Sequence, residues 1–284
     1  DPNGVLAKHG IPMDKTYFVI WTTTTWTLPA NVAVCLNGTF NYVFVKIGDD
    51  YHVMAEDLVK STMEACGITE YEIVGEPVSG AELEYMKVQH PFLERKSLVI
   101  LGDHVTLESG TGCVHTAPGH GPDDYEVGLK YNLEILSPMD DAAVFLPTVP
   151  LFAGMNVFDA NEPVLEKLKE TGALMNCGHI THSYPCCWRC KKPLIFRATT
   201  QWFISMEKND LRRKALDAID NKVTWIPSWG RERIHNMIAT RPDWCISRQR
   251  QWGVPIVALV CEDCGEAWND PKWMREISDR FAKH

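Results

Sequence analysis

The sequence has 284 residues, of which 45% are hydrophobic and 23% charged, which suits one large or two medium globular domains. No run of about 18 apolar residues occurs, so no membrane-spanning helix is expected. The net charge of −9 is unevenly spread, with 10 Lys/Arg against 25 Asp/Glu in residues 1–180 and 18 against 12 in residues 181–284. The first part would need a local site to bind nucleic acid. The second part either holds a phosphate backbone or presents a solvated basic face.

The first ten residues, DPNGVLAKHG, match neither a secretory signal nor a transit peptide. Ten cysteines are scattered along the chain, most of them alone within apolar stretches, as buried thiols are. This usage favours reduced cysteines and a cytoplasmic location. Residues 1–16 are expected to be a leader or linker, and a turn-like start without methionine predicts a segment cut from a longer chain.

Strands dominate residues 17–182. Runs rich in β-branched and aromatic residues predict strands at 17–21, 41–47, 51–54, 97–101 and 112–116. Many strands with few helices indicate an α+β fold with a β-barrel-like domain rather than alternating βαβ units.

Helical periodicity is clear in two places. One helix is predicted at 56–66, ended by Gly67, and another at 162–172, capped by Asp159 or Asn161. Composition changes near residue 182, after which the chain is richer in Trp and Arg. We therefore expect a domain boundary near residue 182. The second part, residues 183–284, is expected to end in a buried strand, GVPIVALVC, and a helix near its terminus.

The stretch WTTTTWTLPAN (21–31) places four threonines between two tryptophans, where a predicted strand passes into a turn. Four adjacent β-branched residues suit a helix poorly. In a strand only two of them could share a face. Two interpretations are open: a polar strand end with capping hydroxyls, or hydroxyls and backbone N–H groups that face a ligand.

A second dense stretch, GTGCVHTAPGHGPDDY (110–125), combines four glycines with His115, His120, Asp123 and Asp124. A metal site, a structural loop and a ligand pocket are all compatible with it. The spacing matches no short metal signature, and Gly and Pro between the histidines prevent one helical face from holding both. A ligand pocket is favoured, because a loop needs no such set of side chains merely to turn.

Two CxxC pairs, Cys187/Cys190 and Cys261/Cys264, each resemble half of a zinc knuckle. Their wide separation exceeds that of compact zinc modules, so one Cys₄ site would require the fold to bring them together. The arginines of RPDWCISRQRQWGVP (241–255) fit either a phosphate-binding patch or an ordinary charged turn.

These four motifs, including SYPCCWRCKKPL (183–194), resemble in order and spacing the isoleucyl-tRNA synthetase family of class I aminoacyl-tRNA synthetases. The resemblance covers residues 17 to 264. Related valyl and leucyl enzymes usually continue the threonine peptide with Arg-Pro, whereas TWTLPAN favours isoleucine. The family commonly has proline where this chain has Thr25.

Neither His-Ile-Gly-His nor Lys-Met-Ser-Lys-Ser, the family's nucleotide-binding signatures, occurs in this chain. The resemblance therefore implies a fragment that does not activate isoleucine. It would hold the inserted editing domain at 17–182 and, at 183–284, a connective segment with zinc knuckles and part of the Rossmann-type catalytic core. ATP and Mg²⁺ belong to the full-length enzyme only, and editing needs no cofactor. Zn²⁺ could occupy the CxxC pairs, which in zinc-bearing members belong to separate sites.

The implied activity is hydrolysis of valine from the 3′ CCA end of mischarged isoleucine tRNA. The resemblance assigns editing roles to six residues: Thr22, Thr23, Thr24, Asn31, His115 and Asp124. Asp124 would hold the α-ammonium group of the ester, and His115 would lie against the amino-acid side chain. Substrate contacts are expected from Trp21, Gly119, His120 and Asp123.

The implied partners are tRNA, the mischarged valine ester and the remainder of the synthetase, with no membrane. A rival hypothesis, motivated by the basic second part and the CxxC pairs, is a zinc-ribbon RNA-binding module without catalysis.

Overall fold

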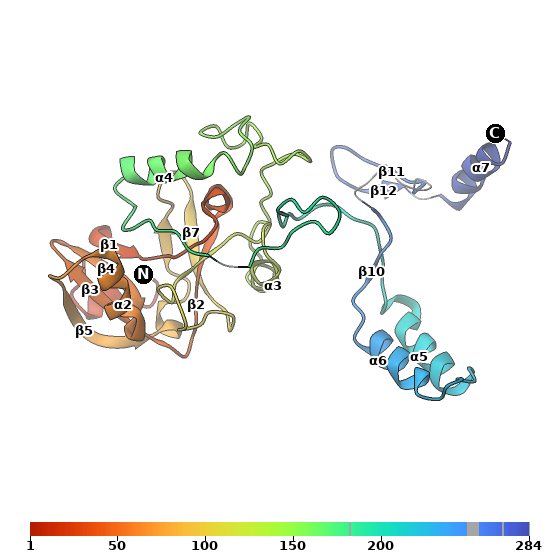
Figure 1. The fold of residues 1–284 in the computed structure, drawn as a ribbon, viewed down its shortest axis with the longest axis horizontal. Helices are drawn as coiled ribbons and strands as arrows, with labels where there is room; N and C mark the ends of the chain where they lie inside the picture. The colour runs from red at the N-terminus through yellow and green to blue at the C-terminus, as the bar shows by residue number, and fades with distance from the viewer. Residues whose placement is uncertain (182, 249–255, 269, 284) are drawn as a thin grey trace. The chain divides into compact units, whose positions relative to one another are not determined.

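The computed structural model describes residues 1–181, 183–248, 256–268 and 270–283. Contacts divide the chain into two units, Asp1–Thr199 and Thr200–His284 (Figure 1). The segment after residue 182 remains attached to the first unit, where Ala198 donates its N–H to the carbonyl of Gly119. No helix in the described ranges has the length and apolar character needed to cross a membrane.

Two four-stranded sheets form the frame of the first unit. One has the order β1-β4-β3-β5, with β1 (Thr16–Phe18), β3 (Asn41–Ile47), β4 (Asp50–Ala55) and β5 (Glu72–Ser79). The other has the order β6-β7-β2-β8, with β2 (Ala33–Leu36), β6 (Lys87–Gln89), β7 (Lys96–Leu101) and β8 (Val114–Thr116). The α+β fold is as expected. Among the described strands neither sheet closes on itself, so the barrel-like closure is not confirmed.

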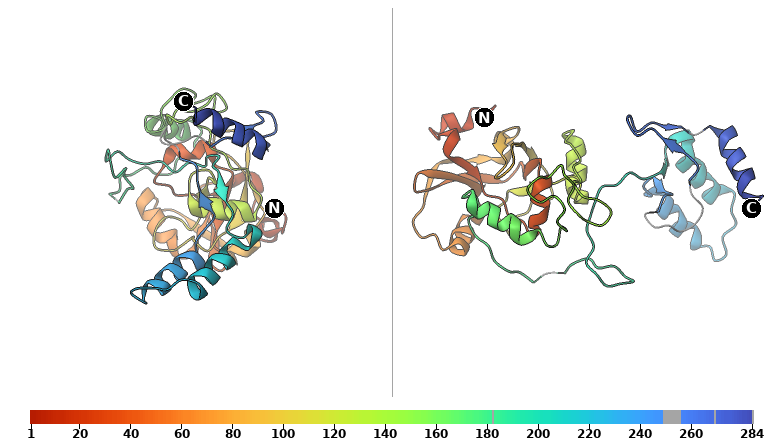
Figure 2. Two further views of the ribbon diagram at one scale, coloured as in Figure 1. Left: turned by 90° about the vertical axis from the view of Figure 1, so that its right-hand side faces the viewer. Right: turned by 90° about the horizontal axis from the view of Figure 1, so that it is seen from above.

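The α-helices of the first unit are α1 (Val5–Lys8), α2 (Val59–Cys66), α3 (Pro122–Lys130) and α4 (Asn161–Glu170). Short 3₁₀ helices are η1 (Met13–Lys15), η2 (Thr25–Ala30), η3 (Glu56–Leu58) and η4 (Gly80–Leu83). Helices α2 and α3 each pack on the outer face of one sheet, while α4 packs on η2 (Figures 1 and 2). Val59 and Met63 of α2 pack on the first sheet, and Val127 of α3 packs on the second.

Strand β3 shows why the core forms where it does. Successive side chains of a strand point to opposite faces. Tyr42 and Phe44 enter the core between the two sheets, while Val43 and Val45 meet α2 on the other face. Burial on both faces explains the continuous apolar run in its sequence.

Residues 1–16, expected as a leader or linker, pack into the first unit. Val5, Leu6 and Ile11 are buried in the core between the sheets. The carboxylate of Asp1 accepts hydrogen bonds from the N–H groups of Val5 and Leu6, at 3.0 and 2.9 Å, and so holds the start of α1.

Several details differ from the expected elements. Of the strand predicted at 17–21, only Tyr17 and Phe18 belong to a strand, β1, and Trp21 instead makes an isolated bridge with Val114. The side-chain cap predicted for the helix at 162–172, which is α4, is also wrong. Ala160 occupies the cap position, and Asn161 instead donates to the carbonyl of Phe158 and accepts from Thr25.

The second unit is built from small elements. They are β9 (Phe203–Ile204), η5 (Lys208–Asp210), α5 (Leu211–Asn221), α6 (Gly230–Ala239), β10 (Trp244–Cys245), β11 (Leu259–Val260), β12 (Ala267–Trp268) and α7 (Pro271–Phe281). Helices α5 and α6 lie side by side (Figures 1 and 2). The described residues of this second unit form two antiparallel sheets of two strands each, β9 with β10 and β11 with β12. A Rossmann-type fold has a parallel sheet, so the expected piece of the catalytic core is not confirmed.

The C-terminal helix expected from the sequence is α7. Within the strand expected at 253–261, Leu259 and Val260 do form a short strand, β11. Its expected burial is wrong, because these two side chains are 52% and 51% exposed. Residues 249–255, which include most of the arginine motif's second half, lie outside the described residues.

Candidate functional site

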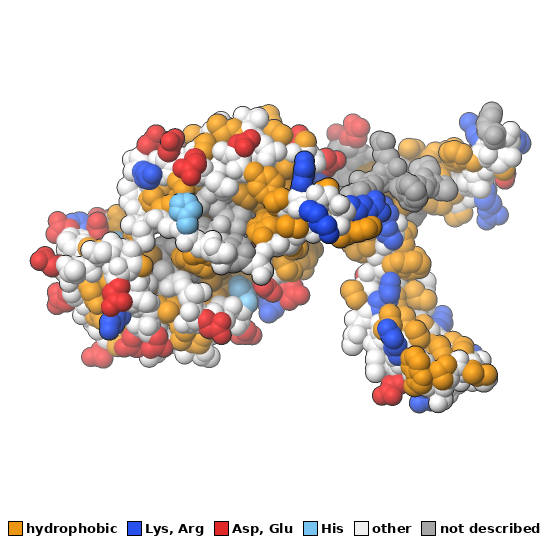
Figure 3. Space-filling view, in the orientation of Figure 1, with side chains coloured by type: hydrophobic (Ala, Val, Ile, Leu, Met, Phe, Trp, Pro, Cys, Tyr) orange, Lys and Arg blue, Asp and Glu red, His pale blue; other side chains and the backbone are white. Residues whose placement is uncertain are grey.

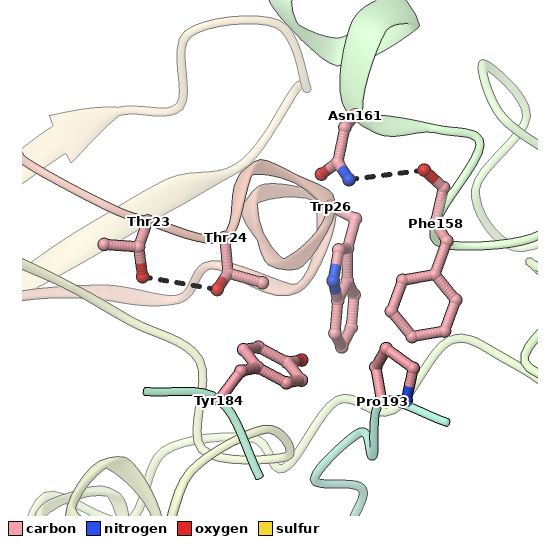
Figure 4. Close-up of a pocket in the computed structure, with 7 residues that line it drawn as sticks. All are labelled: Thr23, Thr24, Trp26, Phe158, Asn161, Tyr184 and Pro193. Carbon is pink, nitrogen blue, oxygen red and sulfur yellow. Dashed lines mark hydrogen bonds between the residues drawn. The ribbon is translucent and has the colours of Figure 1, made fainter. Parts of the chain in front are cut away.

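The threonine-rich peptide bends out of the sheet and starts a 3₁₀ helix. The hydroxyl of Thr22 accepts a hydrogen bond from the N–H of Thr24, at 3.1 Å, which turns the chain. Helix η2 begins directly after Thr24. The hydroxyls of Thr23 and Thr24 lie 3.5 Å apart on the exposed side of this bend (Figure 4). A run that suits neither helix nor strand therefore forms a hydroxyl-lined corner.

A buried relay of hydrogen bonds connects this corner to His115. The Asn31 side-chain amide donates to Nδ1 of His115, at 2.7 Å, and Nε2 of His115 lies 2.9 Å from the Thr27 hydroxyl. The Thr27 hydroxyl gives its own proton to the carbonyl of Thr24, at 2.7 Å, so Nε2 of His115 must carry the donated proton. His115 is therefore a neutral imidazole with its proton on Nε2.

Burial agrees with a neutral imidazole. Desolvation, followed by the nearby His90 and His120, lowers the pKa of His115 to about 3. The hydroxyl of Ser97 donates to the Asn31 side-chain oxygen, and the Arg95 guanidinium donates to the Asn31 carbonyl at 2.9 Å. Asn31 and His115 thus lie inside the protein, with their polar atoms engaged.

The His/Asp loop is held closely against the next segment. A Cβ on Gly119 would lie only 1.9 Å from the carbonyl oxygen of Leu136, so the close approach requires glycine. Asp124, in the first turn of α3, accepts the N–H of Ala117 at 2.9 Å. Burial raises the pKa of Asp124, and the Ala117 N–H opposes that shift.

His120 joins this loop to the threonine peptide. Its ring meets the Trp26 ring edge to face, with centroids 5.2 Å apart, and its Nδ1 donates to the carbonyl of Phe196 at 3.0 Å. Burial lowers the pKa of His120. Together with the Thr27–His115 contact, this packing brings together two motifs that lie about ninety positions apart in the sequence.

A pocket of about 190 Å³ opens beside the threonine corner (Figure 4). Its lining combines the threonine hydroxyls and an amide side chain with aromatic rings and a proline. Its lining residues are Thr23, Thr24, Trp26, Phe158, Asn161, Tyr184 and Pro193.

Of the residues expected at the site, Thr23 and Thr24 line this pocket. Asn31 and His115 lie behind it in the relay, and Asp123 is exposed at the start of α3. Trp21 is 45% exposed, and a Cβ on Gly110 would touch its ring. The roles assigned to these residues stay predictions.

Sequence reasoning missed most of the apolar wall. Phe158 comes from the turn before α4, Asn161 is the first residue of α4, and Tyr184 and Pro193 come from the segment that carries a CxxC pair. Trp26 stands inside the quoted threonine peptide, and its position directly after the threonines was the one available signal.

The two CxxC pairs adopt the same turn. In each, the residue after the second cysteine has a positive φ, 61° for Lys191 and 69° for Gly265. That residue donates its N–H to the carbonyl of the first cysteine, which is Cys187 in one turn and Cys261 in the other. Each turn thus has the backbone form of half of a zinc knuckle.

The structure does not confirm the zinc ligands predicted at these turns, which are Cys187, Cys190, Cys261 and Cys264. Within the described ranges no group of three or more His, Cys, Asp or Glu side chains could hold a metal ion. Tetrahedral zinc takes four ligands, and each turn supplies only two. Neither Cys187 with Cys190 nor Cys261 with Cys264 therefore makes a complete zinc site by itself.

Comparison with known proteins identifies the family. The profile described as tRNA synthetases class I (I, L, M and V) matches residues 41–284. The chain belongs to this family.

Curated relatives refine the assignment. The isoleucine–tRNA ligase of Desulfovibrio desulfuricans is 65% identical over 95% of this chain, and that of Nitratidesulfovibrio vulgaris is 61% identical over all of it. The isoleucine–tRNA ligase of Geobacter sulfurreducens is 55% identical over 94% of the chain. These relatives confirm the resemblance to isoleucyl-tRNA synthetases. The chain spans 29–30% of their length.

Among solved structures, the chain matches the CP1 region of GlLeuRS, with 18% identity, a TM-score of 0.48, and coverage of 65% of this chain and 92% of that one. Another is the editing domain of the P. knowlesi cytosolic leucyl-tRNA synthetase, with 12% identity, a TM-score of 0.43, and coverage of 55% and 82%.

Proposed function

We propose that the first unit is the editing domain of an isoleucyl-tRNA synthetase. It hydrolyses the ester of wrongly attached valine at the 3′ CCA end of isoleucine tRNA. The observation that carries the proposal is the contact between the threonine-rich peptide and the His/Asp loop. It places hydroxyls of Thr23 and Thr24 at a pocket while Thr27 and Asn31 hold His115 behind it.

The reaction needs a positioned water and groups that steady the developing oxyanion. The Thr23 and Thr24 hydroxyls, at the mouth of the corner, are placed to orient the water and the ester. His115 is neutral at physiological pH, because its pKa is about 3, so it cannot stabilise the developing oxyanion with a positive charge. Its hydrogen bond to Thr27 instead fixes the carbonyl of Thr24 and thereby the direction of the threonine peptide.

Discrimination and anchoring would belong to different side chains. Valine and isoleucine differ by one methylene, which binding alone discriminates by only about 1–3 kcal/mol; the handling of this pair by this synthetase is the standard illustration of that limit. A second site that excludes the larger side chain overcomes it. Asp124 is assigned to the α-ammonium group through a charge-assisted contact. His115, which lies behind the lining residues, is assigned to the steric limit of the site through the threonine peptide that it fixes.

In the whole synthetase, ATP and Mg²⁺ would act in the catalytic core, and the remainder of that enzyme and tRNA would be the partners. We place the enzyme in the cytoplasm, since all ten cysteines of this chain are free thiols, as in a reducing compartment.

The test is deacylation by this chain of isoleucine tRNA charged with valine, with the same tRNA charged with isoleucine as the control. We expect release of valine well above the spontaneous rate and little release of isoleucine. If the chain binds the charged tRNA but releases neither amino acid, the rival interpretation as a non-catalytic RNA-binding module is correct.

A further inference from the structure

Residues 184–194 form a hairpin whose base is part of the pocket. Leu194 donates its N–H to the carbonyl of Pro185, at 3.0 Å, and Cys187 donates to Lys192, at 2.8 Å. Tyr184 and Pro193, at the base, line the pocket opposite Trp26 and Phe158 (Figure 4). The hairpin therefore leads from the pocket to a tip formed by residues 188–191.

The tip exposes an aromatic ring together with several cations. Trp188 is 75% exposed, and the Arg189 guanidinium lies over its ring, 4.6 Å from the centroid. Lys191 and Lys192 are exposed beside it. In the part of the chain that the structure describes, no carboxylate lies within salt-bridge distance of these three cations.

The rest of the first unit has the opposite character. Residues 1–180 hold 25 acidic against 10 basic side chains, and acidic groups are spread over the face of this unit in Figure 3. A nucleic-acid backbone is repelled by that surface and attracted by the hairpin tip. Unpaired cations beside an exposed aromatic ring are the combination by which proteins hold single-stranded nucleic acid.

We propose that the hairpin tip is a docking site for single-stranded RNA. Arg189, Lys191 and Lys192 contact phosphates, a base stacks on Trp188, and the strand runs along the hairpin toward the pocket at its base. The inference deepens the proposed function and rests on it, since it names the surface that receives the 3′ end of the RNA.

The first test measures binding of this chain to a short fluorescent oligoribonucleotide that ends in CCA and carries no amino acid. The variant Arg189→Gln/Lys191→Asn/Lys192→Gln removes three charges, and asparagine suits the positive φ at position 191. We expect affinity at low salt to fall at least about tenfold. The slope of log affinity against log salt should fall by about 2, for three phosphates on a single strand.

Trp188→Ala separates stacking from charge. Loss of one stacked base should weaken binding about fivefold or more while leaving the salt slope unchanged. The matched control, Arg213→Gln/Lys214→Gln/Lys222→Gln, removes the same charge from α5 and the residue after it and should bind within about twofold of the wild-type chain.

If the two triple variants bind the oligoribonucleotide equally weakly, the loss reflects only the net charge of the chain, and the proposal is overturned. Wild-type affinity of the triple variant at the hairpin tip would also overturn the proposal. The tip would then be a surface that contacts protein rather than RNA. Because the probe carries no ester, its binding is independent of hydrolysis. A chain that binds through the tip but releases no valine would refute the editing function alone.

Discussion

At the scale of single residues, the site depends on the neutral tautomer of His115. One imidazole accepts from Asn31 and donates to Thr27, which in turn fixes the Thr24 carbonyl. His90 holds η2, the 3₁₀ helix that contains Thr27, because its Nε2 donates to the carbonyl of Leu28 at 2.9 Å. Both histidines are effective only while they are uncharged.

Acid should therefore destabilise the first unit before its carboxylates titrate. Burial lowers the pKa of His90 to about 4 and that of His115 to about 3, below the ordinary value of about 6.5. The folded state binds fewer protons, so the stability from each histidine is fully present above pH ~6.5 and is lost as the pH falls. At pH ~5 the loss is roughly 2 kcal/mol for each histidine. Urea unfolding from pH ~7.5 to ~5 measures it.

The control is His115→Gln, which removes one of the two titrating groups. Its free energy of unfolding should vary less steeply with pH over this interval. An unchanged pH dependence in this variant would mean that His115 does not titrate as its burial requires.

Asp124→Asn tests the assigned anchor. The amide oxygen still accepts the Ala117 N–H, so the fold is kept, but the charge that would attract an ammonium group is gone. We expect loss of valine release from mischarged tRNA, by about a hundredfold or more, from one charge-assisted contact worth about 3 kcal/mol. The exposed Glu126→Gln on the same helix is the control. Wild-type deacylation by Asp124→Asn would show that the ammonium is held elsewhere.

At the scale of elements, the site depends on the close packing of loop against loop. A Cβ at Gly119 would meet a backbone oxygen at 1.9 Å, and a backbone oxygen cannot rotate away. We expect Gly119→Ala to lower the free energy of unfolding by about 3 kcal/mol, as overpacking does, and to move the His120 contact with Trp26. Gly178→Ala is the matched control, since nothing lies within 4 Å of its Cβ. Equal urea midpoints for the two variants would contradict this packing.

The elements also show how far the sequence could lead. Strand β3 was predicted with its bounds because residues 42–45 form a continuous run of aromatic and β-branched side chains that is buried on both faces. Helix α3 was missed because Gly and Pro in the preceding loop suggested a turn. Yet Pro122 at its first position and Asp123 and Asp124 in its first turn are ordinary signs of a helix start.

The site could be predicted only where a motif marked it. The threonines and histidines were found because their residue types are unusual for a turn. The apolar wall at Phe158 and Tyr184 was not, because those side chains reach the pocket through tertiary packing of segments with no pattern of their own.

At the scale of the whole chain, we expect hydrolysis of the mischarged ester without activation of isoleucine. Neither nucleotide-binding signature of the synthetases occurs in the sequence. We expect no isoleucine-dependent exchange of pyrophosphate with ATP, measured with labelled pyrophosphate, under conditions in which valine release is readily detected. Robust exchange by the pure chain would contradict its assignment as a segment without the activation site.

Zinc should likewise be weakly held. Each CxxC turn supplies two thiols, from Cys187 and Cys190 or from Cys261 and Cys264, and four ligands complete a tetrahedral site. Metal analysis after dialysis should therefore find less than about one zinc per chain, readily removed by a chelator. Valine release should be unchanged by chelation, since no metal is proposed in the pocket. Stoichiometric zinc that resists chelation would mean that the two turns share one site.

The relay through His115 also provides a spectroscopic signal. A ring proton on a buried Nε2, given to a hydroxyl whose own proton is engaged, exchanges with water slowly. It should therefore appear as a separate resonance far downfield in a proton NMR spectrum recorded in water. That single line would report whether the threonine corner is correctly formed, in the free chain or with RNA bound, without any assay of catalysis.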